Sequence, residues 1–277
     1  VQIHSDASEI GRLHNVTLAI SASTDVALEA LASTSDRQAF PDFSAWCKKA
    51  CSAKAIFAMG FPEGETGKGI HPFHAARAVA DAAGPKAVYV LDGGESSSWG
   101  GAAIRVDGPG RVQSHGYLGC LGIGPGMSIG CQVAHPDRRV VQITGDGTMG
   151  FHIQELDTMV RHHLPVVTVI LNNQVWGMSI HGQQIMYGQN YNVITKLGET
   201  RYADIAAAFG CYGERVTKLA DVGPAMKRAL DSGKPAVIEI MTDADVVHPV
   251  TVSMLGKAAE GSNDVLIPYY ENIPAGR

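Results

Sequence analysis

Few charges, few cysteines and no long apolar stretch are found in this sequence, and each shortage excludes a class of protein. Charged residues make up 18% of the 277 residues, the net charge is −5, and no basic cluster is longer than Lys48-Lys49 or Arg138-Arg139. A nucleic acid or an anionic membrane is therefore not an expected partner. The apolar run at 166–171 is far shorter than the roughly 20 residues that cross a bilayer, so no membrane span is expected.

The cysteines are too few and too irregularly spaced to suggest a disulfide framework or a metal site. Their odd number, five, favours reduced thiols and a cytoplasmic location. With 45% hydrophobic residues, the chain can bury one good core together with a smaller appendage, as is typical of part of a soluble enzyme. The cysteines are Cys47, Cys51, Cys120, Cys131 and Cys211.

Two apolar runs with a helical pattern between them predict a βαβ unit. Residues 140–144 and 166–171 have the composition of buried strands, and apolar side chains over 151–162 follow one helix face. The crossover returns the second strand parallel to the first. Together with other alternating segments, it predicts an α/β fold, a doubly wound parallel sheet with helices on both faces. The other helices are expected at 26–31, 72–83, 202–209 and 222–232, and the other strands at 87–91, 212–216 and 236–241.

Oxygen-bearing side chains follow each strand of this βαβ unit. Residues 143–147 read Ile-Thr-Gly-Asp-Gly, and Asn172-Asn173 follows after 24 further residues. Because the carboxyl ends of both strands meet at one edge of the sheet, Asp146 and Asn173 are expected to face one crevice. Carboxylate and amide oxygens beside glycines, where the backbone can approach closely, suit Mg²⁺ that holds a diphosphate.

This pattern resembles the GDG…NN signature of thiamine diphosphate enzymes. In that family the aspartate, the second asparagine and a carbonyl two residues later bind the metal, which implies Asp146, Asn173 and Val175 here. Other segments are similar to benzaldehyde lyase and its acetolactate synthase-like relatives, and the likeness runs from about residue 70 to residue 241. These segments are His71-Pro72-Phe73-His74-Ala75, His115-Gly116-Tyr117-Leu118-Gly119, and Asn172-Asn173-Gln174-Val175-Trp176-Gly177 with His181, Gln183 and Gln184 close behind.

The resemblance implies a domain organisation as well. Residues 1–35 are expected to be the end of a middle domain, 36–70 a linker, 71–245 the thiamine diphosphate-binding domain and 246–277 a tail or lid. The glutamate that activates the cofactor and the pyrimidine-binding domain that carries it are expected outside this sequence. The chain is therefore expected to be a fragment or one subunit of a split enzyme, and a homodimer or homotetramer is expected because the cofactor of this superfamily lies between subunits.

The resemblance also assigns roles to individual residues, each with a simpler structural alternative. Gly119 would offer its carbonyl to the aminopyrimidine, Leu121 would be the wedge that bends the cofactor, and His115 would relay protons. Leu121 is otherwise ordinary core, and His115 a structural histidine. Trp176 and His181 would wall the substrate pocket, or simply pack. The remaining cofactor-binding candidates, which surround the diphosphate and the metal, are Gly93, Gly94, Glu95, Gly145, Gly147, Thr148 and Gly177.

Two glycine-rich segments invite other interpretations. Residues 116–130 lack the G-x-G-x-x-G spacing and a directly preceding strand, so a dinucleotide-binding loop is disfavoured. Residues 64–69 superficially resemble a P-loop, but Pro62 stands where the first glycine belongs, and Gly69 follows the lysine in place of Ser or Thr. The segment is interpreted as a linker.

The expected activity is that of a thiamine diphosphate- and Mg²⁺-dependent lyase or carboligase acting on a 2-hydroxy ketone or an aldehyde. Ser97 stands where benzaldehyde lyase presents a tyrosine, so the preference for aromatic aldehydes is open. The alternatives are an acetolactate synthase-like enzyme, a 2-hydroxyacyl-CoA lyase, a cofactor-binding module inactive alone, and a Mg²⁺-nucleotide binder. The tail residues that a lid over a large CoA substrate would use are Lys257, Tyr269, Tyr270 and Arg277.

Overall fold

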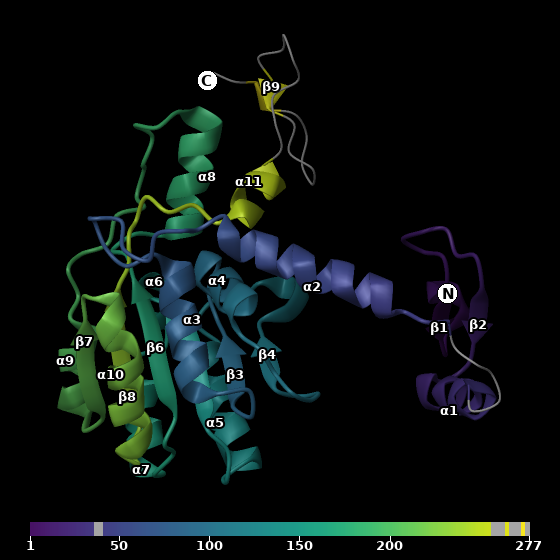
Figure 1. Cartoon of the computed structure of the whole chain (residues 1–277), viewed down its shortest axis with the longest axis horizontal. Coiled ribbons are helices and arrows are strands. Elements are labelled where there is room, and N and C mark those ends of the chain that lie inside the picture. The colour runs from purple at the N-terminus through teal and green to yellow at the C-terminus, as the bar shows by residue number, and fades with distance from the viewer. Residues whose placement is uncertain (36–40, 256–263, 266–272, 275–277) are drawn as a thin grey trace. The chain divides into compact units, whose positions relative to one another are not determined.

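The computed structural model describes residues 1–35, 41–255, 264–265 and 273–274. The chain divides into two compact units, Val1–Gly60 and Phe61–Arg277, which are considered separately (Figure 1). The predicted tail residues Lys257, Tyr269, Tyr270 and Arg277 lie outside the described part. Within the described part, no helix combines the length and the apolar character needed to cross a membrane.

The first unit contains a small parallel strand pair and two helices. Ile3 and Ile20 are partners in the strand pair. The second helix lies in the predicted linker 36–70, which is therefore not a simple extended connection. Its sequence contains five alanines and three lysines, which are strong helix formers. The elements are β1 (Gln2–His4), η1 (Ala7–Glu9), β2 (Ala19–Ser21), α1 (Thr24–Ser35) and α2 (Ser44–Met59).

The second unit is built on a six-stranded sheet in which every pairing is parallel, with strand order β4-β3-β5-β6-β8-β7. The central strands β5, β6 and β8 are almost entirely buried, as expected for strands covered on both faces. The predicted strands 212–216 and 236–241 are confirmed. The strands are β3 (Val88–Leu91), β4 (Val112–Ser114), β5 (Val140–Gly145), β6 (Val167–Asn172), β7 (Tyr212–Val216) and β8 (Ala236–Met241).

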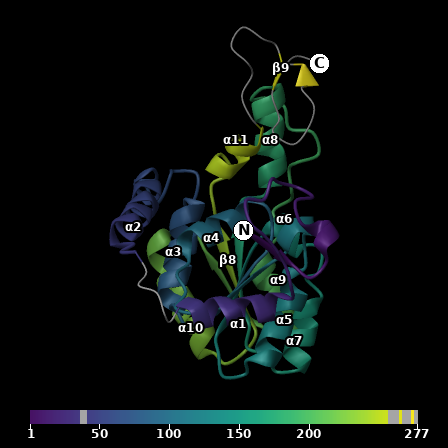
Figure 2. The ribbon, with the colours of Figure 1, turned by 90° about the vertical axis from the view of Figure 1, so that its right-hand side faces the viewer.

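Helices cover both faces of this sheet, which confirms the predicted doubly wound α/β architecture. Figure 2 shows α3 and α10 on one side of the sheet and α5, α7 and α9 on the other. The helices are α3 (Pro72–Ala83), α4 (Glu95–Ala103), η2 (Gly116–Leu118), α5 (Gly124–Ala134), α6 (Asp146–Met149), α7 (Glu155–Arg161), α8 (Gly177–Tyr187), α9 (Tyr202–Phe209), α10 (Leu219–Asp231) and α11 (Pro249–Leu255). Beyond them, β9 (Asp264–Val265) and β10 (Ile273–Pro274) pair antiparallel.

Helix α3 shows why a sequence pattern can define an element to the residue. Pro72 occupies the first turn, where its missing N–H costs nothing, and His71 Nδ1 accepts a hydrogen bond of 3.1 Å from the N–H of Phe73. Gly84, with φ of 85°, ends the helix, because few other residues adopt that conformation. The helix therefore spans the predicted residues 72–83.

The crossover between β5 and β6 differs from the predicted helix over 151–162. Helix α7 begins only at Glu155, and the residues before it form turns with hydrogen bonds between residues three apart, such as Phe151 N–H to the carbonyl of Thr148 at 3.2 Å. Gly147 and Gly150 interrupt the region after β5, and glycine weakens a regular helix. The strand ends keep their predicted places because the crossover still returns β6 parallel to β5.

The glycine-rich segment at 61–69, which the sequence predicts to be a linker, belongs to the second unit and contacts its other elements. Glu65 accepts a hydrogen bond of 2.7 Å from the N–H of Leu219, and Ile70 exchanges backbone hydrogen bonds with Met241 and Asp243. A Cβ on Gly69 would lie 2.8 Å from the backbone of Asp243. The close backbone contact, rather than flexibility, explains the glycine at this position.

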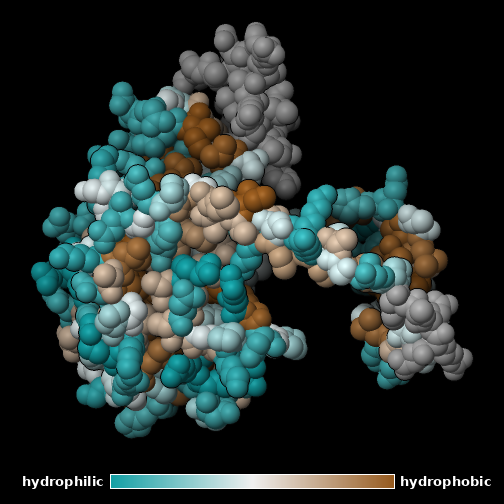
Figure 3. Space-filling model, viewed as in Figure 1, coloured by the Kyte–Doolittle hydropathy of each residue, from teal (hydrophilic) through white to brown (hydrophobic). Residues whose placement is uncertain are grey.

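Helices α8 and α11 lie side by side beyond the carboxyl edge of the sheet. Figure 3 shows hydrophobic side chains on the surface of this region. Ile185 on α8, and Val252 and Met254 on α11, are between 37% and 45% exposed. These two helices and the ends of β3, β5 and β6 surround a cavity at the carboxyl edge.

Candidate functional site

A cavity of about 490 Å³ lies at the carboxyl edge of the sheet, where ligands bind in open α/β folds. The structure brings together there all the residues that the sequence predicts for cofactor and metal binding. Residues from α4, α8 and α11 complete its walls. The predicted residues that line it are Gly93, Gly94, Glu95, His115, Gly119, Leu121, Gly145, Asp146, Gly147, Thr148, Asn173, Val175, Trp176 and Gly177.

Asp146 is buried at the first position after β5, where the strand passes directly into α6. Its side chain is 3% exposed, and its Oδ2 accepts a hydrogen bond of 2.8 Å from the N–H of Gln174. Its own carbonyl accepts a hydrogen bond of 2.8 Å from the Tyr202 hydroxyl. Burial raises the pKa of Asp146 to about 6, against the opposing effect of N–H groups such as those of Gly147 and Gln174. A cation beside the carboxylate would favour its charged form.

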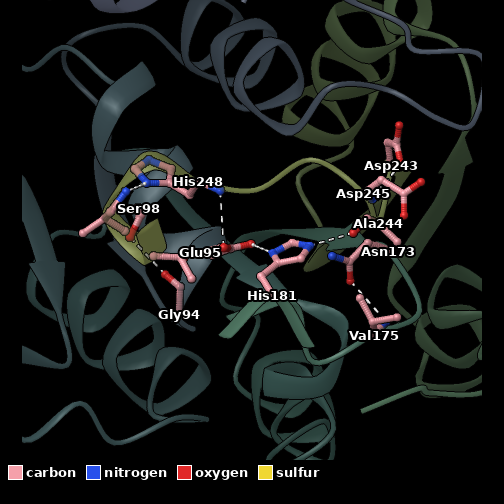
Figure 4. A network of polar contacts seen from close by, with 12 residues as sticks. Gly94, Glu95, Ser98, Asn173, Val175, His181, Asp243, Ala244, Asp245 and His248 are labelled. Carbon is pink, nitrogen blue, oxygen red and sulfur yellow. Dashed lines mark hydrogen bonds and ion pairs between the residues drawn. The ribbon is translucent and has the colours of Figure 1, made fainter. Parts of the chain in front are cut away.

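The loop after β6 brings Asn173 and Val175 toward Asp146. Gln174 has φ of 62°, a left-handed conformation that is uncommon outside glycine. Its N–H donates to Asp146 and also to Asn172 Oδ1, at 3.1 Å. Asn173 Oδ1 accepts a hydrogen bond of 3.2 Å from the N–H of Val175, as Figure 4 shows. These bonds hold the loop in a tight turn at the cavity wall.

Glu239, which the sequence interpretation did not single out, supports this loop from inside the sheet. Its carboxylate is fully buried on β8 and accepts hydrogen bonds from Asn172 Nδ2 at 2.8 Å and from the N–H of Ala203 at 3.1 Å. Arg215 Nε lies 3.7 Å from the same carboxylate. Since Asn172 donates its amide to Glu239, its oxygen faces Gln174. The only signal in the sequence is an acidic residue inside the apolar strand 236–241.

Glycines form the part of the cavity next to β3 and β5. Gly93 has φ of 103°, and a Cβ there would lie 2.2 Å from Ser96 Oγ. A Cβ on Gly94 would lie 3.1 Å from Met178, and one on Gly147 would lie 2.9 Å from the indole ring of Trp176. Larger residues would collide with these neighbours, so glycine allows the backbone and the surrounding side chains to pack closely along the cavity wall.

The loop carrying Gly119 and Leu121 is anchored by Asp92, a second residue that the sequence interpretation did not single out. The buried Asp92 carboxylate accepts hydrogen bonds from the N–H groups of Gly124 at 2.7 Å, Gly93 at 2.9 Å and Gly122 at 3.2 Å. Burial raises its pKa, and these three N–H groups oppose that effect. The carboxylate thus connects the end of β3 to the loop, and Leu121, half-buried, faces the cavity.

His115 stands at the edge of the same loop. Its Nε2 lies 3.2 Å from the carbonyl of Gly93, and its Nδ1 lies 3.0 Å from the carbonyl of Gly116. The ring is therefore held against the glycine-rich end of β3 while it lines the cavity. Structural and chemical roles are compatible in this position.

The model of the family "Thiamine pyrophosphate enzyme, C-terminal TPP binding domain" matches residues 92–240, more than half of the chain. The chain belongs to this family. The suspected resemblance to thiamine diphosphate enzymes is thereby confirmed, and thiamine diphosphate, with Mg²⁺ as the usual metal of the family, is the cofactor of this domain.

Relatives of this thiamine pyrophosphate-binding domain include several enzymes. The acetolactate synthase large subunit IlvG of Mycobacterium tuberculosis is 37% identical over 75% of this chain and 38% of its own length. A sulfoacetaldehyde acetyltransferase of Alcaligenes xylosoxydans xylosoxydans is 32% identical over 69% of this chain and 32% of its own. The structure of a thiamine diphosphate-dependent 4-hydroxybenzoylformate decarboxylase from Rhodococcus jostii RHA1 superimposes with a TM-score of 0.68 and 25% identity, covering 87% of this chain and 43% of that one. The chain thus spans less than half the length of these relatives.

The cavity of the thiamine pyrophosphate-binding domain fits its cofactor. A buried carboxylate, an amide oxygen and a backbone carbonyl are hard oxygen donors, and Mg²⁺ prefers such donors and completes its coordination with water and phosphate oxygens. Gly94 and Gly147 line the cavity beside them, so backbone rather than a larger side chain would face an anion bound there. The Asp146 carboxylate follows β5, and the glycines at 93 and 94 follow the adjacent strand β3.

One of the two predicted substrate-wall residues, His181, has other surroundings in this domain. His181 is buried beside Glu95 and is not among the described residues that line the cavity, which corrects its predicted place in the substrate wall, whereas Trp176 does line it. Glu95 lines the cavity, and its carboxylate contacts His181. Ser97 lines the cavity, and its hydroxyl donates to the carbonyls of Gly93 and Gly94 at 2.6 and 2.8 Å.

Proposed function

We propose that this chain supplies the cofactor-binding domain of a thiamine diphosphate- and Mg²⁺-dependent enzyme that cleaves or forms C–C bonds of 2-hydroxy ketones. The observation that carries the proposal is the convergence of Asp146, Asn173 and the glycine-lined wall on one cavity at the carboxyl edge of the sheet. Membership of the thiamine pyrophosphate-binding family supports it.

The metal ligands in this proposal are the Asp146 carboxylate, the Asn173 amide oxygen and the Val175 carbonyl. Asp146 brings the negative charge, and Gln174, held in its left-handed conformation, sets the turn that presents the other two. Gly145, which ends β5 directly before Asp146, lines the same wall. Water and diphosphate oxygens would complete the octahedral coordination that Mg²⁺ requires.

The diphosphate is proposed to lie against backbone N–H groups on both sides of the metal. Gly93, Gly94 and Glu95 lead into the amino end of α4, whose free N–H groups and dipole favour an anion. Gly147 and Thr148 present backbone from the side of β5.

The remaining cavity residues are proposed to orient the reacting rings and the substrate. Bound thiamine diphosphate supplies a nucleophilic carbon and an electron sink for C–C bond chemistry. Leu121 would support the bent cofactor, the carbonyl of Gly119 would accept a hydrogen bond from its amino group, and Trp176 and Gly177 would border the metal side. His115, held by Gly93, would hold or move a proton at its ring nitrogen.

The proposal includes a ranking of three candidate substrates and reactions. The sequence motifs favour a benzaldehyde lyase-type reaction on a 2-hydroxy ketone or an aldehyde, and the similarity to acetolactate synthases supports an acetolactate synthase-like carboligation as the second candidate. A 2-hydroxyacyl-CoA lyase is a third. A pyrimidine-binding domain from a neighbouring subunit, in a homodimer or homotetramer, is proposed to supply the activating glutamate.

A pair of titrations tests the cofactor, and turnover tests the reaction. Calorimetry with thiamine diphosphate and with ADP, each in Mg²⁺, should show binding of thiamine diphosphate only, and comparable binding of ADP would overturn the assignment. Benzoin cleavage and pyruvate consumption should then be measured for the chain alone and with a pyrimidine-binding partner. Turnover only with the partner is expected. Turnover by the isolated chain would show that it contains its own activating group.

A further inference from the structure

A buried ion pair joins α4 to α8 behind the cavity wall. Glu95 Oε2 lies 2.8 Å from His181 Nδ1, and the two side chains are 7% and 2% exposed. Figure 4 shows Glu95 between His181 and His248. Removing two charges from water is costly, and such a pair persists only where its geometry and its further hydrogen bonds are good.

The hydrogen bonds around the pair define its charge state. His181 Nε2 lies 2.8 Å from the carbonyl of Ala244, which can only accept, so this nitrogen carries a proton. Glu95 Oε1 accepts from the Thr251 hydroxyl at 2.5 Å and the N–H of His248 at 3.3 Å. The raised pKa of His181 favours the imidazolium, which donates from both nitrogens, one of them to Glu95 Oε2. Burial lowers the pKa of His181, but the hydrogen bond and charge of Glu95 outweigh it and raise the pKa overall.

These five residues come from three segments that meet only here. Glu95 lies in the first turn of α4, His181 is in the middle of α8, and Ala244, His248 and Thr251 belong to the segment that leads into α11 and its first turn. The sequence separations are large, 86 residues between Glu95 and His181 and 156 between Glu95 and Thr251. The pair thus connects both helices beyond the sheet edge to the glycine turn proposed to hold the diphosphate.

The same helices provide the apolar wall of the cavity. Met178 on α8 lies against Gly94, where a Cβ would come within 3.1 Å of its side chain. Val250 and Met254 on α11 line the cavity from the neighbouring helix. Methionine and valine side chains pack without directional bonds, so their contacts alone leave the two helices able to shift along each other. A buried, directional ion pair does not tolerate such a shift.

We propose that Glu95 and His181 form a latch that positions the α8–α11 wall over the cofactor and thereby sets the shape of the space a carbonyl substrate enters. The latch deepens the proposed function and rests on it for its effect on the substrate. Both residues are positioning residues, because they act through Met178, Val250 and Met254 and not by direct contact with the reacting atoms.

A latch predicts an asymmetry between substitutions that a simple packing role does not. In His181→Gln the Glu95 carboxylate stays buried without its cation, which is the costly case. In Glu95→Gln the histidine can lose its proton and remain bonded through one nitrogen, which costs less. The double variant Glu95→Gln/His181→Gln places two neutral amides together, and these can hydrogen-bond again. Both helices should therefore exchange more slowly in the double variant than in His181→Gln alone.

Hydrogen–deuterium exchange on the full chain, read by mass spectrometry, tests the latch without any need for catalysis. We expect exchange in peptides covering 177–187 and 244–255 to be about tenfold faster or more in His181→Gln, less affected in Glu95→Gln, and largely restored in the double variant. Peptides from β5 and β6 serve as the internal reference. Asp157→Asn, which removes an exposed partner of Arg161 on α7, is the matched control and should change neither peptide.

The latch would be overturned if both helices exchanged at the wild-type rate in His181→Gln. It would also be overturned if they exchanged as fast in the double variant as in His181→Gln. If His181→Gln does not fold, the comparison of Glu95→Gln with the double variant decides, since the latch requires the double variant to fold and its two helices to exchange no faster than those of Glu95→Gln. A titration of His181→Gln with thiamine diphosphate and Mg²⁺ separates the two proposals. Faster helix exchange in His181→Gln with cofactor binding retained supports both the latch and the proposed function. A wild-type chain that does not bind the cofactor contradicts the proposed function alone.

Discussion

Replacement of Glu239 by Gln tests whether the metal loop depends on support from inside the sheet. The Glu239 carboxylate accepts from two donors, Asn172 Nδ2 and the N–H of Ala203. A glutamine has one oxygen to offer, so its NH₂ group must face one of these donors. The most direct relief is rotation of the Asn172 amide, which would turn an NH₂ toward Gln174 and remove the hydrogen bond that supports its left-handed conformation.

The magnitude follows from these contacts. Substitutions of groups that orient metal ligands reduce metal affinity by about 10- to 100-fold, which corresponds to about 1.4 to 2.8 kcal/mol. Loss of a negative charge near Asp146 acts in the same direction, because Glu239 contributes to the potential that attracts a cation. Leaving one buried donor without a partner should also lower the free energy of unfolding by about 1 to 3 kcal/mol.

Calorimetric titration of Mg²⁺ at fixed thiamine diphosphate measures the affinity, and thermal unfolding without either ligand measures stability. Glu214→Gln is the matched control, because it makes the same chemical change on the neighbouring strand β7, where the carboxylate pairs with Arg228. Its Mg²⁺ affinity should stay within about twofold of wild type, well below the effect expected for a supporting residue. A Glu239→Gln variant that loses stability but binds Mg²⁺ like the control would refute the reasoning and leave Glu239 a packing residue.

Three further predictions concern the cavity and its surroundings. Gly147→Ala places a Cβ 2.9 Å from the Trp176 ring and should weaken thiamine diphosphate binding in a titration by roughly the 1–3 kcal/mol typical of overpacking. Asp146→Ala should bind thiamine diphosphate equally weakly with Mg²⁺ and with EDTA in a titration, whereas the wild type should bind it more tightly with Mg²⁺, and a retained Mg²⁺ dependence in the variant would place the metal elsewhere. Burial, with the nearby His74, lowers the pKa of His71 from 6.5 to about 4, so the unfolded chain takes up the proton first as pH falls. Denaturant unfolding should therefore show a loss of about 2 kcal/mol between pH 7 and pH 5, and His71→Asn, which can still cap α3, should lack that loss.

The elements that sequence reasoning placed well are those whose signals are local. Helix α3 has its proline, its capping histidine and its terminal glycine within 14 consecutive residues, 71–84. The βαβ unit needs only two apolar runs and a helical spacing between them, and the handedness rule then places Asp146 and Asn173 at one edge. The ends of β5 and β6 were therefore predictable even though the crossover helix α7 proved shorter than expected.

The residues that sequence reasoning missed act over long separations. Glu239 and Asn172 are 67 residues apart, and Asp92 and Gly124 are 32 apart. No spacing rule connects such pairs, because their meeting depends on strand order and on the packing of whole helices. For the same reason His181 was assigned to the substrate wall, since its partner Glu95 lies on a distant helix whose side-chain direction the sequence does not show.

Four of the buried carboxylates in and around the cavity, Asp92, Glu95, Asp146 and Glu239, differ in what compensates their charge, and the difference points to the metal. Asp92 has three N–H donors, Glu95 has the His181 imidazolium, and Glu239 has an amide, an N–H and the nearby Arg215. For Asp146, no ion pair is found within the described residues, and burial raises its pKa to about 6. It is also the carboxylate that lies beside the asparagine loop and the glycine wall. A cation bound there would remove the cost of burying the charge of Asp146. Burial of this carboxylate, which destabilises the domain without metal, would therefore increase its affinity for Mg²⁺ and the diphosphate.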